Sequence, residues 1–411
     1  MKKINRERVD FLMTGLAKFG ACEGKGITRL AYSEVDRHAQ DWLLEQISDL
    51  NLQVREDAVG NVYLRLPGKD GSLPPVASGS HLDTVIHGGA YDGVCGVVGA
   101  LEALYMLSDT VHKRSIEVII FRAEESSRFG FATIGSKLLT GEAVPDNFIK
   151  GNRRGDISYK EALAEWGCAP ERYAEAVRKP GDFKSFCEMH IEQGRVLEET
   201  GTQLGIVHSI AAPTRFKIQI CGVADHSGAT PMGFRHDALV SAAKLVLAVE
   251  QAAANEKLHG TVGTVGVVDV EPGSINVVPG NVTLWVDVRG GEVDSIQRTL
   301  ESIQKAMEDV AESDEVEVSM EMLASDLPVI LDKDLSVQSE EICRSKGITF
   351  RHMMSGAGHD AMHMAKLCPA TMLFLPCRGG ISHNPAEFAE LDDICCAIEV
   401  LAEILQREAA E

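Results

Sequence analysis

Residues 76–84 read Val-Ala-Ser-Gly-Ser-His-Leu-Asp-Thr, and this stretch decides the fold class of the chain. A short run of small and apolar residues, typical of a buried strand, ends at His81. Asp92-Gly93 then opens a turn, and residues 94–107 have the pattern of a helix with small residues on one face. A buried strand, a polar turn and a helix in this order are typical of an α/β sheet.

Three other apolar runs are followed by polar residues in the same way. They are residues 116–121 before Glu124-Glu125, residues 185–189 before His190, and residues 371–375 before His383. Because such strands alternate with helical segments, the sequence predicts an α/β catalytic domain with a mixed β-sheet flanked by helices. Ligands of such sheets bind beyond the carboxyl ends of the strands, where these polar residues lie.

The middle of the chain follows a different order. The pattern predicts a strand (215–222), a helix (237–254), two strands (261–270 and 281–289), a helix (293–311) and a strand (316–323). This β-α-β-β-α-β order is typical of ferredoxin-like α+β units, and Pro213 and Pro328 lie near its ends, where linkers often carry proline. We therefore expect a catalytic domain formed by residues 1–212 and 328–411, interrupted by an inserted domain of residues 213–327.

Composition excludes several classes of protein. The 411 residues are 45% hydrophobic and 25% charged, as in a globular chain of two domains. The net charge of −21 disfavours a nucleic-acid partner, which needs basic clusters. No apolar run approaches the ~20 residues of a membrane span, and no apolar segment of a signal peptide follows the N-terminus. We expect a soluble, cytoplasmic protein without a membrane partner, whose ten scattered cysteines are mostly buried thiols.

Five residues near the predicted strand ends form a set of nitrogen and oxygen ligands: His81, Asp92, Glu125, His190 and His383. If Asp92 bridges two ions, each ion receives three protein ligands and keeps a position for water. Such a set suits Zn, Mn, Co or Ni and contains no soft thiolate. Each residue alone also fits a structural histidine or a solvated carboxylate, but their joint occurrence at strand ends favours a site for two divalent metal ions.

Two neighbours of these residues suggest catalytic roles. Glu124 and Glu125 are adjacent, so that one carboxylate can bind metal while the other acts as general base on a water molecule. The alternative is a solvated loop in which Arg128 pairs with one of the acids. Asp83, two residues after His81, is a candidate for the carboxylate that orients a metal-binding histidine.

Seven motifs together resemble a known family. They are GSHLDTVIHGGAYDG (79–93), AEESSRFGFATIGS (123–136), EMHIEQG (188–194), DHSGATPMGFRHDA (225–238), PGSINVVPG (272–280), SGAGHDAMH (355–363) and GISHNPAE (380–387). From about residue 25 to 405 the chain resembles the M20 superfamily of metallopeptidases and amidohydrolases. Within it, the chain is similar to the hydantoinase/carbamoylase branch, which includes N-carbamoyl-L-amino acid hydrolases, β-ureidopropionases and allantoate amidohydrolases.

This resemblance implies a role for each residue of the centre. His81, Asp92 and His190 hold one metal ion, and Asp92, Glu125 and His383 hold the other. Glu124 is the general base, and Asp83 orients His81. His190 indicates the branch, because peptidase relatives usually have a carboxylate at that position.

The resemblance also implies residues that bind the substrate. The inserted domain corresponds to a lid and dimerisation domain, in which His226, Asn276 and Arg289 bind the substrate carboxylate and help to stabilise the reacting carbonyl. The histidine that matches His226 reaches across the dimer in relatives. Gln193 lies near the ureido group, and Gly358 belongs to a loop that lines the substrate. Two divalent ions (+4) and three carboxylates (−3) leave a centre of about +1, to which Arg289 adds a fork suited to a carboxylate.

The function predicted from the sequence is hydrolysis of the C–N bond of an N-carbamoyl amino acid or related ureido acid, with release of ammonia and CO2. The expected partner is a small anionic substrate, and the resemblance implies a homodimer. Three alternatives remain. One is allantoate amidohydrolase activity in the same branch. Another is a dinuclear aminopeptidase or dipeptidase, for which position 190 should be a carboxylate. The last is a catalytically silent binding protein, which should lack Glu124 or a metal ligand, although all are present.

Overall fold

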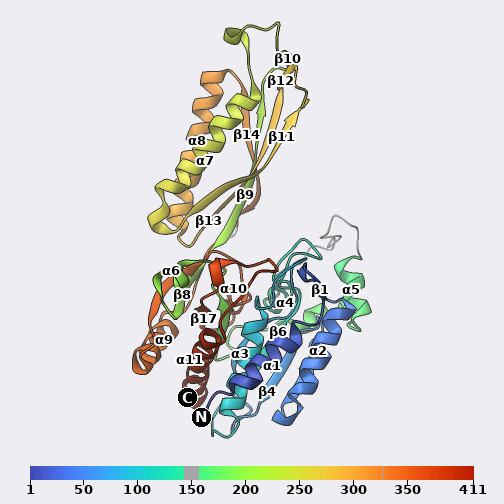
Figure 1. Cartoon of the computed structure of the whole chain (residues 1–411), viewed down its shortest axis with the longest axis vertical. Helices are drawn as coiled ribbons and strands as arrows, with labels where there is room; N and C mark the ends of the chain where they lie inside the picture. Colours follow the sequence, from blue (N-terminus) through green and yellow to red (C-terminus); the bar gives the residue numbers. More distant parts are fainter. Residues whose placement is uncertain (143–156, 326) are drawn as a thin grey trace. The chain divides into compact units, whose positions relative to one another are not determined.

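A computed structural model of the chain describes residues 1–142, 157–325 and 327–411. The chain forms two compact units (Figure 1). Unit 1 consists of Met1–His208, Leu331–Met353 and Gly358–Glu411. Unit 2 consists of Ser209–Ile330 and Met354–Ala357.

Unit 1 is built on a mixed sheet whose central strands are parallel. In the described part of the chain, the strands follow the order β8-β17-β7-β5-β6-β4-β3, and β16 pairs with β8. Strand β5 is parallel to β6 and β7, and β7 is parallel to β17, whereas the outer strands β3, β4 and β8 pair antiparallel. The bounds are β3 (Gln53–Glu56), β4 (Val62–Leu66), β5 (Val76–His81), β6 (Ile116–Phe121), β7 (Ser185–Ile191), β8 (Leu204–Ile210), β16 (Phe350–Ser355) and β17 (Ala370–Leu375).

Helices cover this sheet, and every residue of its central strands β5, β6, β7 and β17 is buried. Helices α1, α3 and α11 pack on one another, and α3 and α11 contact the central strands. Helix α10 contacts β7 and β17, and α4 contacts α10. The helices of unit 1 are α1 (Arg6–Leu16), α2 (Glu34–Gln46), α3 (Val94–Leu107), α4 (Ile134–Leu139), α5 (Tyr159–Glu165), α6 (Val196–Thr200), α9 (Lys333–Lys346), α10 (Ala361–Met364) and α11 (Leu391–Ala410). A short hairpin of β1 (Ala21–Cys22) and β2 (Gly26–Ile27) lies outside the main sheet.

In strand β7, the apolar side chains and the polar side chains lie on opposite faces of the sheet. Cys187, Met189 and Ile191 join the core formed with α3 and α11. Since successive side chains point to opposite faces of a strand, Glu188 and His190 face away from that core. The register of β7 with β17, in which His190 pairs with Phe374, fixes the height of the histidine in the sheet.

The mixed α/β architecture predicted from the sequence is confirmed, and residues 94–107 and 116–121 form the expected helix and strand. The strand expected at residues 185–189 was too short. Strand β7 continues to Ile191 because it pairs with β17 up to Leu375, and His190 therefore lies inside the strand rather than after it.

Unit 2 contains a four-stranded antiparallel sheet in the order β11-β13-β9-β14, with α7 and α8 packed against one face (Figure 1). Its apolar core consists of alternate strand residues such as Phe216, Leu284 and Val286 and of one side of each helix. The bounds are β9 (Ala212–Cys221), β10 (Asp225–His226), α7 (Ala238–Asn255), β11 (Val262–Glu271), β12 (Val277–Val278), β13 (Asn281–Gly290), α8 (Val293–Asp314) and β14 (Glu317–Ser325). Strands β10 and β12 form a separate short pair, and β15 (Val329–Ile330) pairs with Ser209 and Ile210.

In the residues that the structure describes, no helix is both long and apolar enough to cross a membrane.

Candidate metal centre

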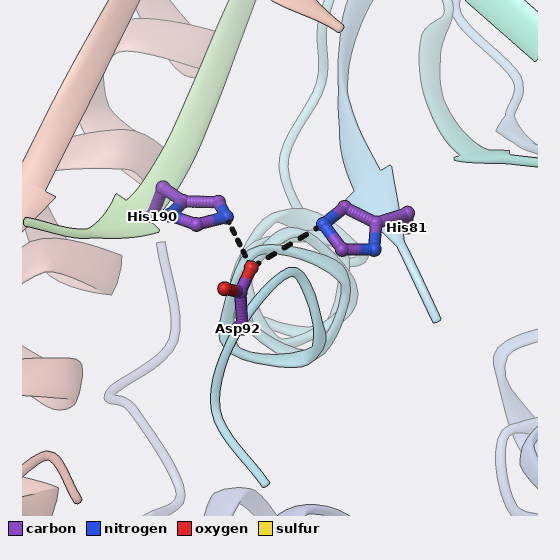
Figure 2. A group of neighbouring side chains, drawn as sticks. All are labelled: His81, Asp92 and His190. Atoms are coloured by element: carbon purple, nitrogen blue, oxygen red, sulfur yellow. Dashed lines mark ion pairs between the residues drawn. The ribbon is translucent and has the colours of Figure 1, made fainter. Parts of the chain in front are cut away.

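The predicted metal ligands lie at one edge of the sheet in unit 1, beyond or at the carboxyl ends of the parallel strands. His81 is the last residue of β5, His190 lies in β7, and Asp92 lies in the turn before α3. Figure 2 shows the two imidazole rings pointing at the same carboxylate. The Nε2 atoms of His81 and His190 lie 3.5 and 3.1 Å from Oδ1 of Asp92.

A second group of ligands shares Asp92. Nε2 of His383 lies 3.2 Å from Oδ2 of Asp92 and 3.1 Å from Oε1 of Glu125. The ligand atoms of each group lie within 4.8 Å of one another. Two atoms bound to one tetrahedral ion at about 2.1 Å are roughly 3.4 Å apart, so these spacings suit a divalent ion in each group.

The backbone hydrogen bonds of His81 and His190 involve Nδ1, so Nε2, the ring nitrogen that faces Asp92, is the one that can bind a metal. Nδ1 of His81 donates to the backbone carbonyl of Asp83 at 2.9 Å, and Nδ1 of His190 donates to that of Ile191 at 2.9 Å. A carbonyl oxygen can only accept, so Nδ1 carries the proton and the neutral ring keeps a lone pair on Nε2. Such bonds fix the tautomer and the orientation of a ligating histidine.

Gly93 makes room for this arrangement. Its φ of +66° is unfavourable for other residues, and a Cβ atom there would lie 2.4 Å from the ring of His81. A side chain at position 93 would therefore displace the first histidine. The backbone N–H of Gly93 donates to Nε2 of His190 at 3.2 Å, and a metal ion bound at this nitrogen would replace that hydrogen bond.

The carboxylate of Asp83 stabilises the loop of Glu124 and Glu125, whereas its position two residues after His81 suggested a bond to that histidine. Its backbone carbonyl, not its carboxylate, bonds His81, and the carboxylate Oδ1 lies 3.8 Å from Nδ1 of the histidine. The carboxylate instead accepts the backbone N–H groups of Glu124 and Glu125 at 3.3 and 3.0 Å. Ala123, with a φ of +51°, makes the bend that turns both groups toward Asp83. Asp83 thus holds the loop that carries the adjacent glutamates.

Burial makes the electrostatics of the centre strong. His81, Asp92, His190 and Glu125 are buried, whereas the side chain of His383 is 50% exposed. Burial alone would raise the pKa of Asp92, but the three histidines hold it well below its ordinary value. The hydrogen bonds to Asp92 and Glu125 raise the pKa of His383 to about 10. The carboxylates therefore create a strong preference for positive charge between them, which protons or a metal ion can satisfy.

Glu124 is buried beside the first group of ligands. Its Oε2 lies 3.7 Å from Nε2 of His81. Burial, together with the charges of Glu125, Asp360 and Asp83, raises the pKa of Glu124 well above its ordinary value, although His81 opposes the shift. A carboxylate with a raised pKa binds a proton more readily than a free one, which suits a group that accepts and returns a proton.

Two other residues contact Asp92. The amide Nε2 of Gln193 donates to Oδ2 at 2.7 Å, and the hydroxyl of Ser382 donates to the same atom at 2.8 Å. The side-chain oxygen of Gln193 has no hydrogen-bond partner among the described residues. Gly358 is exposed, and the next residue, His359, packs its ring 4.6 Å from that of His190. Ser382 was not predicted as a site residue, although it lies in the GISHNPAE motif.

The other predicted substrate residues lie in unit 2. His226 is exposed in β10 and pairs with Val277, next to Asn276. Arg289 lies in β13, where its Nε and Nη2 atoms donate to the carboxylate of Asp287 at 3.2 and 3.1 Å. The structure thus brings the predicted metal ligands, Glu124, Asp83 and Gln193 together in unit 1, and places His226, Asn276 and Arg289 in unit 2.

Comparison with known proteins identifies the class. Residues 66–407 match the sequence model of peptidase family M20/M25/M40. An uncharacterized hydrolase of Haemophilus influenzae is 42% identical over 408 residues, 99% of each chain. An N-carbamoyl-L-amino-acid amidohydrolase of Pseudomonas sp. (strain NS671) is 37% identical over 97% of each chain. The crystal structure of an amidase of the hydantoinase/carbamoylase family from Burkholderia multivorans has a TM-score of 0.90 at 31% identity and covers 100% of this chain and 99% of its own.

The fold and the ligand groups are those of a metallohydrolase. The chain belongs to peptidase family M20/M25/M40, and the resemblance predicted from its motifs is confirmed. Other relatives are named ureidoglycolate hydrolase and allantoate amidohydrolase. The protein is therefore a hydrolase of amide-type C–N bonds.

Proposed function

We propose that the protein is a two-metal amidohydrolase that cleaves the C–N bond of an N-carbamoyl amino acid or a related ureido acid. The observation that carries the proposal is the sharing of Asp92 between two ligand groups, with Glu124 buried beside one of them. His81, Asp92 and His190 would hold one ion, and Asp92, Glu125 and His383 the other. The nitrogen and oxygen donors suit Zn, Mn, Co or Ni.

When bound, divalent ions polarise a carbonyl group and lower the pKa of a water molecule toward ~7. The side chains supply the proton transfers. Glu124 takes a proton from the attacking water and returns it to the leaving nitrogen. Asp83 keeps Glu124 in place through its bonds to the backbone of the loop. For a carbamoyl substrate, the products are the amino acid, CO2 and ammonia.

We assign the recognition of the substrate carboxylate to Arg289. Its side chain is 33% exposed, Asp287 holds one side of the guanidinium group, and Nη1 donates to the carbonyl of Gly356 at 3.3 Å. A guanidinium fixed in this way forms paired hydrogen bonds to a carboxylate at little entropic cost. In this assignment unit 2 is the lid domain that the sequence predicts.

The layout of unit 2 supports a dimer. Asn281, at the start of β13, lies three residues after the β10–β12 pair, which contains His226 and directly follows Asn276, whereas Arg289 lies eight residues further along β13. At about 3.4 Å per residue these ends are roughly 27 Å apart, too far for one small substrate. We propose that a second copy supplies His226 and Asn276.

The edge of the sheet in unit 2 offers a surface for this second copy. Within the described residues, β11 pairs only with β13. Its exposed residues include Val262, Val267 and Val268, which are 57%, 48% and 45% exposed. An apolar strand with an unpaired edge is a template for pairing with another chain. Helix α7 adds Leu247, which is 68% exposed.

Ammonia release tests the proposed substrate class. The purified protein, loaded with Mn or Zn, is assayed on N-carbamoyl amino acids, 3-ureidopropionate, allantoate and dipeptides, each with and without EDTA. We expect metal-dependent ammonia release from one ureido substrate. Activity on allantoate alone would select the alternative within the same branch. Cleavage of dipeptides alone would replace the proposal with the dinuclear peptidase, despite the histidine at position 190.

A further inference from the structure

We infer that Glu387, a buried carboxylate outside both ligand groups, is the positioning residue that holds Asp92 between them. The inference rests on the two-metal centre proposed above and not on the identity of the substrate. Glu387 is 5% exposed and follows the turn that carries His383. It belongs to the GISHNPAE motif, in which the sequence analysis gave a role to His383 alone.

The hydrogen bonds of Glu387 lead to Asp92 by two routes. Oε1 accepts the backbone N–H groups of Tyr91 and Asp92 at 2.8 and 3.0 Å, so it fixes the backbone of the bridging residue. Oε2 lies 3.0 Å from the hydroxyl of Ser382, which in turn lies 2.8 Å from Oδ2 of Asp92. One carboxylate therefore ties together the turn before α3 and the turn that carries His383.

These contacts separate Glu387 from the proposed ligands. Oε1 already accepts the backbone N–H groups of Tyr91 and Asp92, and Oε2 lies against the hydroxyl of Ser382, whose single proton can go to either Glu387 or Asp92. The ligand groups found among the described residues do not include it. Its role is therefore to place a ligand rather than to act as one.

The position of Asp92 has to be accurate because its two oxygen atoms serve different groups. Oδ1 faces His81 and His190, and Oδ2 faces His383. A rotation or shift of this carboxylate moves both oxygen atoms, so that neither group keeps its spacing. Groups that orient metal ligands typically change metal affinity by about 10- to 100-fold when removed.

The packing around Glu387 offers a second way to move it. A Cβ atom at Gly89 would lie 2.2 Å from Oε1 of Glu387. The backbone of Gly89 does not have the positive φ that makes alanine unfavourable. Gly89→Ala should therefore displace the carboxylate of Glu387 without altering any charged group.

The test measures metal binding by the apo-protein rather than catalysis. Wild type, Glu387→Ala, Glu387→Gln and Gly89→Ala are titrated with Co²⁺, and affinity and stoichiometry are followed by calorimetry and visible absorption. We expect Glu387→Ala and Gly89→Ala to weaken binding of at least one ion by about 10- to 100-fold. Glu387→Gln keeps an oxygen for the N–H groups of Tyr91 and Asp92, so it should restore most of the affinity lost in the alanine variant.

Glu102→Ala is the matched control for stability. Glu102 is also a buried carboxylate of unit 1 and accepts the backbone N–H of Asn5 at 2.8 Å and the guanidinium of Arg8 at 2.6 Å. Thermal unfolding of the apo-proteins should show a loss of stability in Glu102→Ala with wild-type metal affinity. If Glu387→Ala fails to fold, Gly89→Ala and Glu387→Gln still report on metal affinity.

The outcomes separate this inference from the proposed function. Failure of the wild type to bind Co²⁺ would overturn the metal centre itself. Two ions bound by the wild type and, with equal affinity, by Glu387→Ala and Gly89→Ala would overturn the role of Glu387 alone. An equal loss of affinity in Glu102→Ala would reduce the effect of Glu387 to general stability and would also contradict the inference.

Discussion

Asp92 in unit 1 contacts three histidines and Asp287 in unit 2 contacts two arginines, and the two shared carboxylates differ in what they can bind. Asp92 lies between histidines, and its side chain is 8% exposed. Asp287 lies between Arg215 and Arg289, and its side chain is 31% exposed. Arginine keeps its charge at all accessible pH values, whereas a neutral histidine has a lone pair to offer. Only the first arrangement can exchange protons for metal ions.

Solvent adds to the difference. The ion pairs of Asp287 are partly exposed and are worth little in stability, because water screens them. The charges around Asp92 are buried, where uncompensated charge is costly and a bound cation is correspondingly favoured. A shared carboxylate alone therefore does not indicate a metal site. What indicates it is that the basic partners are histidines and that the group is buried.

The largest effect on metal content should come from replacing the Asp92 carboxylate by an amide, with the same replacement at Asp287 as the comparison. Asp92→Asn removes the charge that both ligand groups share, so we expect the loss of at least one ion per chain and activity near that of the metal-free protein. Asp287→Asn should retain the metal content of the wild type. Metal analysis of the two purified variants checks this, and equal metal content in both would remove the distinction between the two sites.

Glu124→Gln should separate catalysis from metal binding. The amide has nearly the same size but cannot accept a proton, so we expect turnover to fall by about 10²- to 10⁴-fold, the usual contribution of a general base. Metal content should not change. Steady-state kinetics on the substrate found in the ammonia assay measures the loss, and wild-type turnover would show that Glu124 is not the base.

Removal of metal should affect unit 1 more than unit 2. A ligand at 100 times its Kd stabilises the folded state by about 2.7 kcal/mol, and this stabilisation should appear where the ions bind. Hydrogen exchange with and without EDTA should therefore show faster exchange near β5, β7 and the turn before α3. The four-stranded sheet of unit 2 serves as the internal control. Equal changes in both units would contradict a centre confined to unit 1.

The smallest effect on activity is expected from a substitution in unit 2, which should change substrate binding and not turnover. Arg289→Ala should raise KM for an anionic ureido substrate by about 10- to 100-fold, since a hydrogen bond to a charged group contributes about 1.5–3 kcal/mol. An uncharged analogue should be affected much less. Arg215→Ala is the matched control, because Arg215 also contacts Asp287 through its Nε at 3.2 Å. The same KM increase for both substrates would argue against a carboxylate clamp.

The sequence was sufficient to predict those parts of the structure that depend on local pattern. The continuous apolar run of residues 116–121 and the small-residue pattern of residues 94–107 indicated a buried strand and a helix, and both occur as predicted. The residues predicted as ligands also come together, because each lies near or beyond the carboxyl end of one of the parallel central strands of the same sheet.

Other features depended on long-range contacts that a single sequence does not contain. The pairing of β7 with β17 carries the strand through His190. The task of the Asp83 carboxylate depends on a bend at Ala123, about 40 residues away in the chain. Glu387 and Asp92 are 295 residues apart, and their hydrogen bond exists only in the folded chain.

The two-metal centre is tested most directly by an anomalous difference map from crystals of the zinc-loaded protein, measured at the zinc absorption edge. We expect two peaks, one on either side of the Asp92 carboxylate. One peak should be bound by His81 and His190, and the other by Glu125 and His383. The absence of peaks there, or a single ion that does not touch Asp92, would contradict the two-metal centre.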